Sequence, residues 1–299
     1  MNFFSRAAVV ALVCFSSGMV FAQETGDDAA KEKAFLESLQ YKTGSVAVSQ
    51  AKAHLDLKPG FRYLEQQDAR KVLEDYWGNP PDESVLGLII PENAPLGTEH
   101  SWAVVVTFSD DGYVSDEDAS KIDYTEMLKD MKTDTHDSNE DRKSAGYPTM
   151  ELLGWAEPPH YDSSSKRLYW AKEISVEKTD TNTLNYDIRV LGREGYMSLE
   201  AVADMHDLGR VNDGMKQILP MAQFDAGSTY ADYKPGSDKL AAYGLAALVG
   251  GGIAAKAGLF AKLGVLLLAM KKFVILIFVA IAGFFKKMFG KKDGNNTVR

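Results

Sequence analysis

The stretch TLNYDIRVLGREGYMSLEAV at residues 183–202 decides the fold. Leu184, Tyr186, Ile188 and Val190 alternate with polar residues, and a period of two is typical of a half-buried β-strand. The GREG sequence at 192–195 supplies the turn after this strand. The residues beyond the turn return as a second strand, so an antiparallel hairpin is predicted here.

Two segments before this hairpin extend the sheet. MELLGWAEPPHYD at 150–162 and KRLYWAKEISVE at 166–177 have the same strand character, and they predict an antiparallel meander. Apolar, β-branched runs at 85–90 and 102–108 predict buried strands. Helical spacing follows capping residues at 68–76, 124–132 and 204–219. The predicted fold class is α+β, an antiparallel sheet packed with helices, followed by one or two C-terminal transmembrane helices.

The transmembrane prediction rests on the apolar block at 240–285, which lysines divide into parts. Each uninterrupted run is shorter than the ~20 residues that cross a bilayer. Joined across a lysine, residues 240–261 or 263–285 become long enough. We therefore expect a membrane anchor within 237–285, preceded by a linker marked by Gly227, Pro235 and Gly236. The alternative, a helical hairpin buried in a soluble core, is disfavoured because so apolar a segment would dominate the domain.

The N-terminus predicts export. Residues 1–22 contain Arg6, the apolar run AAVVALVCF and the ending Val20-Phe21-Ala22, which together are typical of a signal peptide. Residues 23–236 are then an exported domain at the bacterial inner membrane, on its periplasmic side. Lysines are frequent in the tail at 286–299, so this tail is expected in the cytoplasm. One crossing fits these charges better than a two-helix hairpin.

The exported part is strongly acidic. The whole chain carries a net charge of −9, but residues 240–299 hold nine basic residues and one acidic residue, which leaves −18 for residues 23–239. A field of this sign argues against nucleic acid as a partner and favours basic or cationic partners. A solvated acidic surface is the plainer interpretation. The membrane and another envelope protein are the expected partners.

No motif predicts a catalytic residue, a metal site or a cofactor. Asp116, Glu117 and Asp118 fail as an EF-hand because Lys121 and Met127 take the glycine and glutamate positions. These acids are instead expected to stabilise the N-terminus of the helix that follows. The five histidines have no metal-ligand spacing. The S-x-x-K match at 163–166 follows the K-T-G match at 42–44, in the wrong order for penicillin-binding chemistry.

The best candidate site is a polar, aromatic turn region. Its residues are Trp155, Glu157, His160, Tyr161, Asp162 and Trp170. If strand pairing brings them together, they form a rim of aromatic anchors and polar groups that binds a partner. A catalytic alternative makes His160 a base oriented by Asp162 or Glu157. A third interpretation is turn chemistry beside core tryptophans, and all three remain open at this point.

Several long motifs in one order resemble a known family. They are WGNPP (77–81), DDGYVSDEDASKIDYTEML (110–128), GWAEPPHYD (154–162), LYWAKE (168–173), LNYDIRVLGREGY (184–196) and YADYKPGSDKLAAYGLAALVGGG (230–252). Together they resemble the bacterial "domain of unknown function 2167" family of membrane-anchored proteins, over about residues 40 to 290. The resemblance implies an exported domain with a C-terminal anchor, and it carries no active-site residues.

These observations favour a non-enzymatic envelope protein whose exported domain binds another protein at the membrane surface. An envelope hydrolase of unknown class is the first alternative. The second alternative is an accessory subunit of a membrane transporter or of a stress-response complex.

Overall fold

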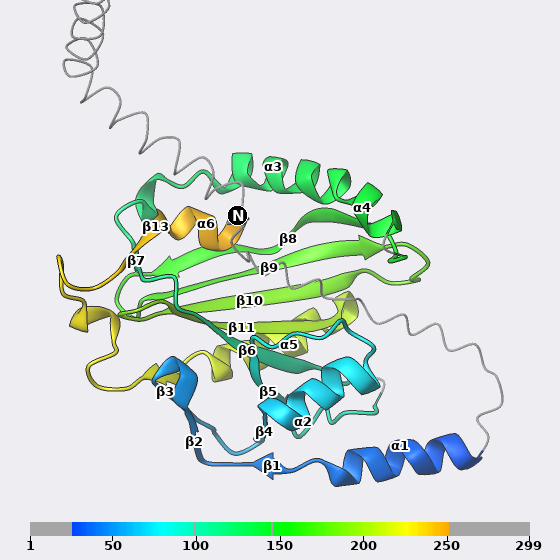
Figure 1. The fold of residues 1–299 in the computed structure, drawn as a ribbon. Helices are drawn as coiled ribbons and strands as arrows, with labels where there is room; N and C mark the ends of the chain where they lie inside the picture. The colour runs from blue at the N-terminus through cyan, green and yellow to red at the C-terminus, as the bar shows by residue number, and fades with distance from the viewer. Residues whose placement is uncertain (1–25, 99, 145, 251–299) are drawn as a thin grey trace, which may run out of the picture. The chain divides into compact units, whose positions relative to one another are not determined.

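One antiparallel sheet dominates the computed structural model, which describes residues 26–98, 100–144 and 146–250. Its eight strands lie in the order β1-β4-β5-β6-β11-β10-β9-β8 (Figure 1). The strands are β1 (Tyr41–Lys42), β4 (Phe61–Glu65), β5 (Val85–Pro91), β6 (Ala103–Ser109), β8 (Met150–Asp162), β9 (Arg167–Val176), β10 (Thr183–Leu191) and β11 (Tyr196–Asp204). The predicted α+β class and the meander are confirmed.

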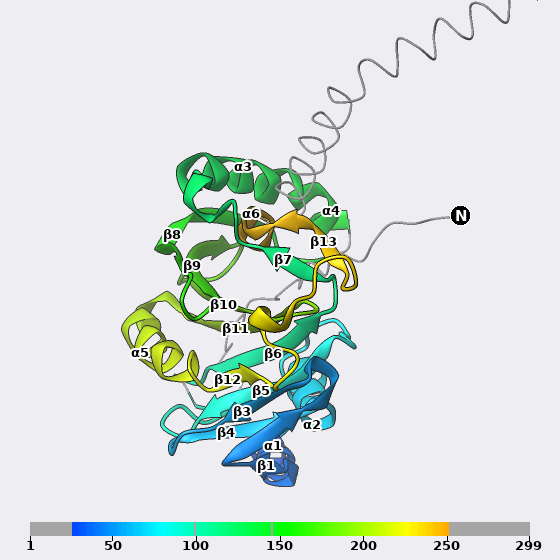
Figure 2. The same cartoon turned by 90° about the vertical axis from the view of Figure 1, so that its left-hand side faces the viewer.

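One face of this sheet, the α5 face, is covered by helix α5 (Leu208–Ile218) and by a small three-stranded sheet. The small sheet has the order β12 (Ala222–Phe224), β3 (Ala53–Asp56), β2 (Ser45–Val48). The alternating apolar residues of β10 point into this layer and join Val211 and Met215 of α5 in one core cluster. Figure 2 shows α5 on one side of the sheet and helices α2 and α6 on the other.

The opposite face, the α6 face, carries two separate apolar clusters. In the first, α1 (Gly26–Ser38), α2 (Gln66–Arg70) and the helical turn Lys71–Tyr76 pack against β4, β5 and β6. In the second, β7 (Tyr113–Ser115), β13 (Leu240–Gly244) and α6 (Leu245–Gly250) pack against β9. Strand β13 pairs with β7 in parallel. Short 3-10 turns lie at Ser49–Ala51, Ala119–Lys121, Met205–Asp207 and Tyr230–Asp232.

A buried ionic network occupies the same face where β9, β10 and β11 meet. Arg189 donates hydrogen bonds to Asp187 at 3.2 Å and to Glu200 at 2.8 Å. Lys172 lies 3.2 Å from the second carboxyl oxygen of Asp187. Burial by itself lowers the pKa of Arg189, but the charges of Glu200 and Asp187 outweigh it and raise that pKa. The four side chains thus form one connected set of ion pairs on this face of the sheet.

Helices α3 (Tyr124–Asp137) and α4 (Asn139–Ser144) run along β8, the edge strand of the sheet (Figure 1). The amide of Asn139 closes part of this edge, because it accepts from the Met150 N–H and donates to the Met150 carbonyl, each at 2.8 Å. Three register irregularities interrupt the pairing of β8 with β9. Register irregularities and a covered edge both protect an edge strand from pairing with other chains. Helix α3 has no buried residue, so its attachment depends on half-buried contacts.

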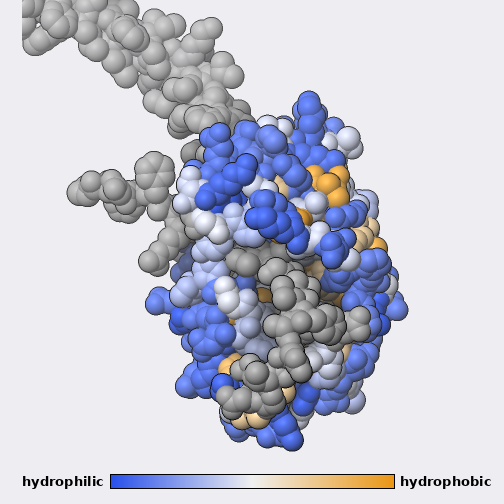
Figure 3. Space-filling view, turned by 90° about the vertical axis from the view of Figure 1, so that its right-hand side faces the viewer, coloured by the Kyte–Doolittle hydropathy of each residue, from blue (hydrophilic) through white to orange (hydrophobic). Residues whose placement is uncertain are grey.

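Large apolar side chains are seldom exposed in the described part of the chain. Those that are exposed are Tyr147 (38%), Leu153 (42%) and Leu240 (54%). The end of the molecule seen in Figure 3 is mainly hydrophilic, with hydrophobic residues in small, separate patches.

The structure corrects the predicted start of the membrane anchor. Residues 240–250, which the sequence places inside the apolar anchor at 237–285, form β13 and α6 and contribute Ala241, Leu245, Leu248 and Val249 to a buried cluster. No helix within the ranges that the structure describes is long and apolar enough to span a bilayer. The predicted signal peptide (1–22), the apolar residues 251–285 and the basic tail (286–299) lie outside the described residues.

Candidate functional site

The strand register divides the predicted rim between the two faces of the sheet. Glu157, His160 and Asp162 pair with Ala171, Tyr169 and Arg167 of β9, on the α5 face. Trp155 and Tyr161 pair with Lys172 and Leu168 and lie, with Trp170, on the α6 face. Residues directly opposite each other in an antiparallel pair share a face. The structure thus divides the six residues between the two faces, with three on each.

On the α5 face, His160 and Asp162 make separate contacts. The His160 ring packs against Tyr169 with ring centroids 5.1 Å apart. Asp162 accepts from the Ser164 and Ser165 hydroxyls at 2.6 Å each, and these hydrogen bonds hold its pKa well below the usual range. Among the described contacts, none joins His160 to Asp162 or Glu157. Asp162 therefore fixes the turn between β8 and β9.

Glu157 affects a different residue of the same face. It and Tyr186 flank the small Ala171 in one row across the sheet. Burial raises the pKa of Tyr186, and the nearby charge of Glu157 raises it further. This phenol therefore stays protonated at neutral pH.

The tryptophans of the other group pack in the apolar cluster of the α6 face. Trp170 is 1% exposed, and the Arg189 guanidinium lies 5.0 Å from its ring centroid. The Trp155 indole N–H donates to the Tyr124 carbonyl at 3.3 Å, which links β8 to the start of α3. Both side chains belong to the cluster beneath α6, so the core interpretation of the tryptophans fits them.

Tyr161 leads to a site that the sequence did not predict. Its hydroxyl donates to Asp116 at 2.6 Å, and the Lys166 ammonium donates to the same carboxyl oxygen at 2.7 Å. The Tyr230 hydroxyl donates to the other oxygen at 3.0 Å. Burial by itself raises the pKa of Asp116, but the hydrogen bonds from Lys166, Tyr161 and Tyr230 outweigh it and lower that pKa.

Aromatic rings extend outward from this carboxylate. The Lys166 ammonium lies 4.7 Å from the centroid of the Tyr230 ring, a cation–π distance. The Tyr230 ring contacts the Tyr113 ring at 4.4 Å, and Tyr113 stacks on Tyr233 at 3.8 Å with 12° between the planes. Tyr230 is buried, whereas Tyr113 and Tyr233 are half-buried.

We call the group the tyrosine site; it consists of Tyr113, Asp116, Tyr161, Lys166, Tyr230 and Tyr233. Burial raises the pKa of Tyr161, and its hydrogen bond to Asp116 adds to this effect. Burial likewise raises the pKa of Tyr230, helped by Tyr113 and Asp116. Both hydroxyls are therefore hydrogen-bond donors at neutral pH, and they fix the orientation of the rings.

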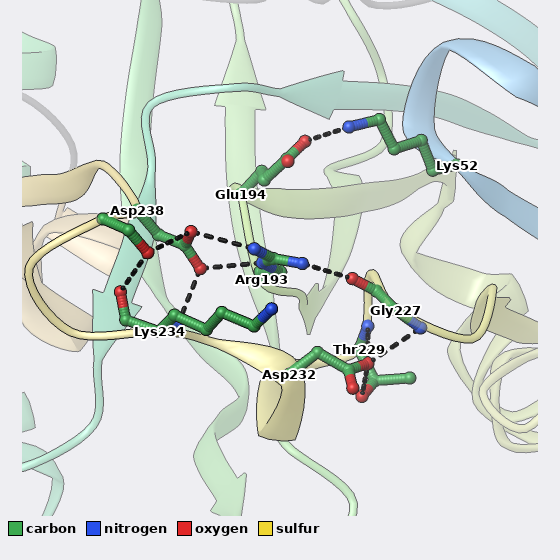
Figure 4. Close-up of polar contacts among 9 residues, drawn as sticks. Lys52, Arg193, Glu194, Gly227, Thr229, Asp232, Lys234 and Asp238 are labelled. Carbon is green, nitrogen blue, oxygen red and sulfur yellow. Dashed lines mark hydrogen bonds and ion pairs between the residues drawn. The ribbon is translucent and has the colours of Figure 1, made fainter.

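The segment that carries Tyr230 and Tyr233 is held to the domain by Arg193 in the β10–β11 turn. The Arg193 guanidinium donates to both oxygens of Asp238, at 2.7 and 2.9 Å, and to the Gly227 carbonyl at 3.0 Å (Figure 4). Asp232 accepts from the Thr229 hydroxyl at 2.6 Å and from the Thr229 N–H at 3.0 Å. Residues 227–239, predicted as a linker, are therefore part of the folded domain.

Asp118 holds the residues that follow. It accepts from the backbone N–H groups of Leu245 at 3.2 Å and Ala246 at 3.5 Å, at the start of α6. A Cβ atom on Gly244 would lie 2.4 Å from this carboxylate, so the approach requires glycine. The cap of α3 is Asp123, which accepts from two N–H groups of that helix. Asp116 and Asp118 thus accept hydrogen bonds from the C-terminal segment, and neither caps α3.

The long separations between these residues along the chain explain why the site was not predicted from the sequence. Lys166 and Tyr230 lie 50 and 114 positions from Asp116 along the chain, and no single sequence motif contains all three residues. Within residues 26–98, 100–144 and 146–250, no three His, Cys, Asp or Glu side chains are placed to hold a metal ion.

Together, the fold and the site define an acidic α+β domain whose C-terminal segment is held by hydrogen bonds beside a tyrosine-rich surface. The family model described as "Protein of unknown function (DUF2167)" matches residues 40–282, and the chain belongs to this family. No curated protein matches the chain.

Two solved structures share a distant likeness of fold. The solution structure of cyanobacterial PsbP (CyanoP) from Synechocystis sp. PCC 6803 aligns with a TM-score of 0.35 and 11% identity, over 62% of this chain and 92% of that one. The Saccharomyces cerevisiae Ran-binding protein Mog1p aligns with a TM-score of 0.31 and 7% identity, over 62% and 96%.

Proposed function

We propose that this chain is an inner-membrane-anchored envelope protein whose exported domain binds another protein through the tyrosine site. The observation that carries the proposal is the half-buried, stacked pair Tyr113 and Tyr233, supported from below by Tyr230 and Asp116. Tyrosine is enriched among the residues that dominate protein–protein binding energy. It supplies a large contact area with only two side-chain torsions to fix.

The surface is organised before any partner arrives. Arg193 holds the chain on both sides of the Tyr230 turn, through Gly227 and Asp238. A surface that is already ordered loses less conformational entropy on binding, and more of the contact energy appears as affinity. The predicted signal peptide and apolar C-terminal residues support the location of the domain at the membrane surface.

Affinity co-purification in mild detergent tests this function. We expect the full-length protein to retain a stoichiometric partner, and residues 23–250 to retain the same partner. Tyr233→Ala should lose it. Tyr147→Ala is the matched control, because Tyr147 is a solvent-accessible tyrosine (38% exposed) that precedes β8 and lies outside the tyrosine site.

Two outcomes would overturn the proposal. Retention of the partner by residues 251–299 alone would instead favour a subunit that assembles through its membrane segment. Equal loss in the Tyr233 and Tyr147 variants would show that the tyrosine site has no special part in binding. Thermal unfolding of each variant must accompany the assay, so that loss of folding is not mistaken for loss of contact.

A further inference from the structure

We infer that the partner presents a basic segment to the tyrosine site, with a lysine ammonium or an arginine guanidinium against the outer ring of the stack, Tyr233. This inference rests on the proposed function, since it names the chemistry that the same surface would recognise. It is argued from a cation that the site already holds, from the ring that remains accessible, and from the local charge.

The first argument is that the inner end of the site binds an ammonium of the chain itself. Lys166 lies 4.7 Å from the centroid of the Tyr230 ring and 2.7 Å from an oxygen of Asp116. A tyrosine face beside a carboxylate therefore already serves as a cation site in this fold. Cations are attracted to such rings because the face of the ring carries negative charge.

The second argument concerns the outer end. Tyr233 stacks on Tyr113 and is half-buried. Tyr113 in turn contacts Tyr230, so the three rings form one continuous series. Among the described residues, Tyr113 is the one ring that stacks on Tyr233. The accessible part of Tyr233 is thus the place where a partner residue reaches the series.

The third argument is the local charge. The segment at 110–118, which carries Tyr113, holds five carboxylates and no basic residue. With the acids of 230–239 included there are seven carboxylates, against Lys166, Arg193, Lys234 and Lys239, which leaves a net charge of −3. One of the four bases, Lys239, donates to the carbonyl of Asp110. A basic partner therefore meets a complementary surface.

Helix α3 provides an internal comparison. It is also acidic, and its Asp130 and Asp134 are exposed, as are Asp110, Asp111 and Glu117 near the tyrosine site. Exposed charges interact weakly across water and are screened by salt. If diffuse attraction alone decided binding, α3 would contribute as much as the tyrosine site. If the rings decide it, α3 would contribute little.

The experiment measures binding of a labelled, end-blocked hexa-arginine peptide to the full-length protein in detergent, at about 150 mM salt. We expect Tyr233→Ala to weaken binding about fivefold. Tyr233→Phe keeps the ring and should bind like the parent protein. The double variant Asp130→Asn, Asp134→Asn removes two charges from α3 and should change affinity by less than about twofold.

Three results would overturn the inference. They are an unchanged affinity in Tyr233→Ala, an equal loss in the α3 double variant, and an equal loss in Tyr233→Ala when the peptide is hexa-glutamate. Failure of this inference is distinct from failure of the proposed function. A co-purified partner that depends on Tyr233 but is not displaced by hexa-arginine would leave the function standing and exclude the basic segment. The absence of any partner would instead remove the function.

Discussion

Removal of the Asp116 carboxylate is the most informative perturbation of this domain. Its two oxygens accept hydrogen bonds from Tyr161, Lys166 and Tyr230. The Asp116 side chain is 21% exposed and that of Lys166 is 31% exposed. Hydrogen bonds to charged groups contribute about 1.5–3 kcal/mol each, but water replaces part of this at a partly exposed site. We expect Asp116→Ala to lower the free energy of unfolding by about 3 kcal/mol.

The pH dependence gives a second, independent readout. The folded-state pKa of Asp116 is lowered, so the native state binds the proton less readily than the unfolded state does. The stabilisation is therefore complete above the unfolded value, about 4, and is lost as the pH falls through the folded value. Asp116→Asn should differ most from the parent protein above about pH 5, and this difference should shrink below about pH 4.

Urea denaturation of residues 23–250, followed by circular dichroism, provides both readouts. Lys166→Met completes a double-mutant cycle that isolates the ion pair. A change below about 0.5 kcal/mol in Asp116→Ala would refute the reasoning, because it would mean that water replaces all three donors. A difference between Asp116→Asn and the parent protein that is the same at pH 3 and pH 7 would refute the pH argument.

Three further changes test other parts of the structure. Arg193→Ala should lower the unfolding free energy by about 2 kcal/mol, because the paired hydrogen bonds to Asp238 are lost. For the same reason it should speed proteolysis within 227–239, and mass spectrometry of a limited digest locates the cuts. Gly214→Ala should cost about 1–3 kcal/mol, measured by denaturation, since a Cβ there would lie 2.5 Å from the Trp102 ring. Asn139→Ala should open the edge of β8, cost about 1–2 kcal/mol and raise light scattering on mild heating; unchanged scattering would show that the helices and the register irregularities of β8 protect this edge without the Asn139 amide.

The sheet was predictable because its strands alternate in the simplest way. In β10, every second residue from Leu184 to Val190 is apolar, and these residues all lie in the core of the α5 face. The register of β10 with β11 runs without interruption from Thr183 to Leu191, so the pattern along the sequence is also the pattern in space. The predicted hairpin is confirmed for this reason.

The division of the rim was not predictable in the same way. Strand β8 carries three register irregularities between Leu152 and His160. Each extra residue moves the side chains that follow to the other face. Trp155 and Glu157 are two positions apart, yet they lie on opposite faces. The local sequence does not indicate where such irregularities occur.

The apolar composition of residues 240–250 was ambiguous for a different reason. A short apolar run fits a buried strand, a buried helix or the start of a membrane span equally well by hydropathy. The choice is made by distant residues, namely Tyr113, which pairs with Leu240, and Asp118, which caps α6. The sequence signal for the tyrosine site is similarly dispersed, since its carboxylate and its rings come from separate segments.

Strand β13 also limits the length of chain between the fold and the next apolar run. With Gly250 held by the domain, only residues 251–262 separate the fold from the apolar run that begins at Leu263. Twelve residues reach at most about 40 Å when fully extended. A chain that was free from Gly227 onward would have 36 residues before the same point and a reach of about 120 Å. For an anchor that begins at Leu263, the docked strand therefore shortens the longest possible tether about threefold.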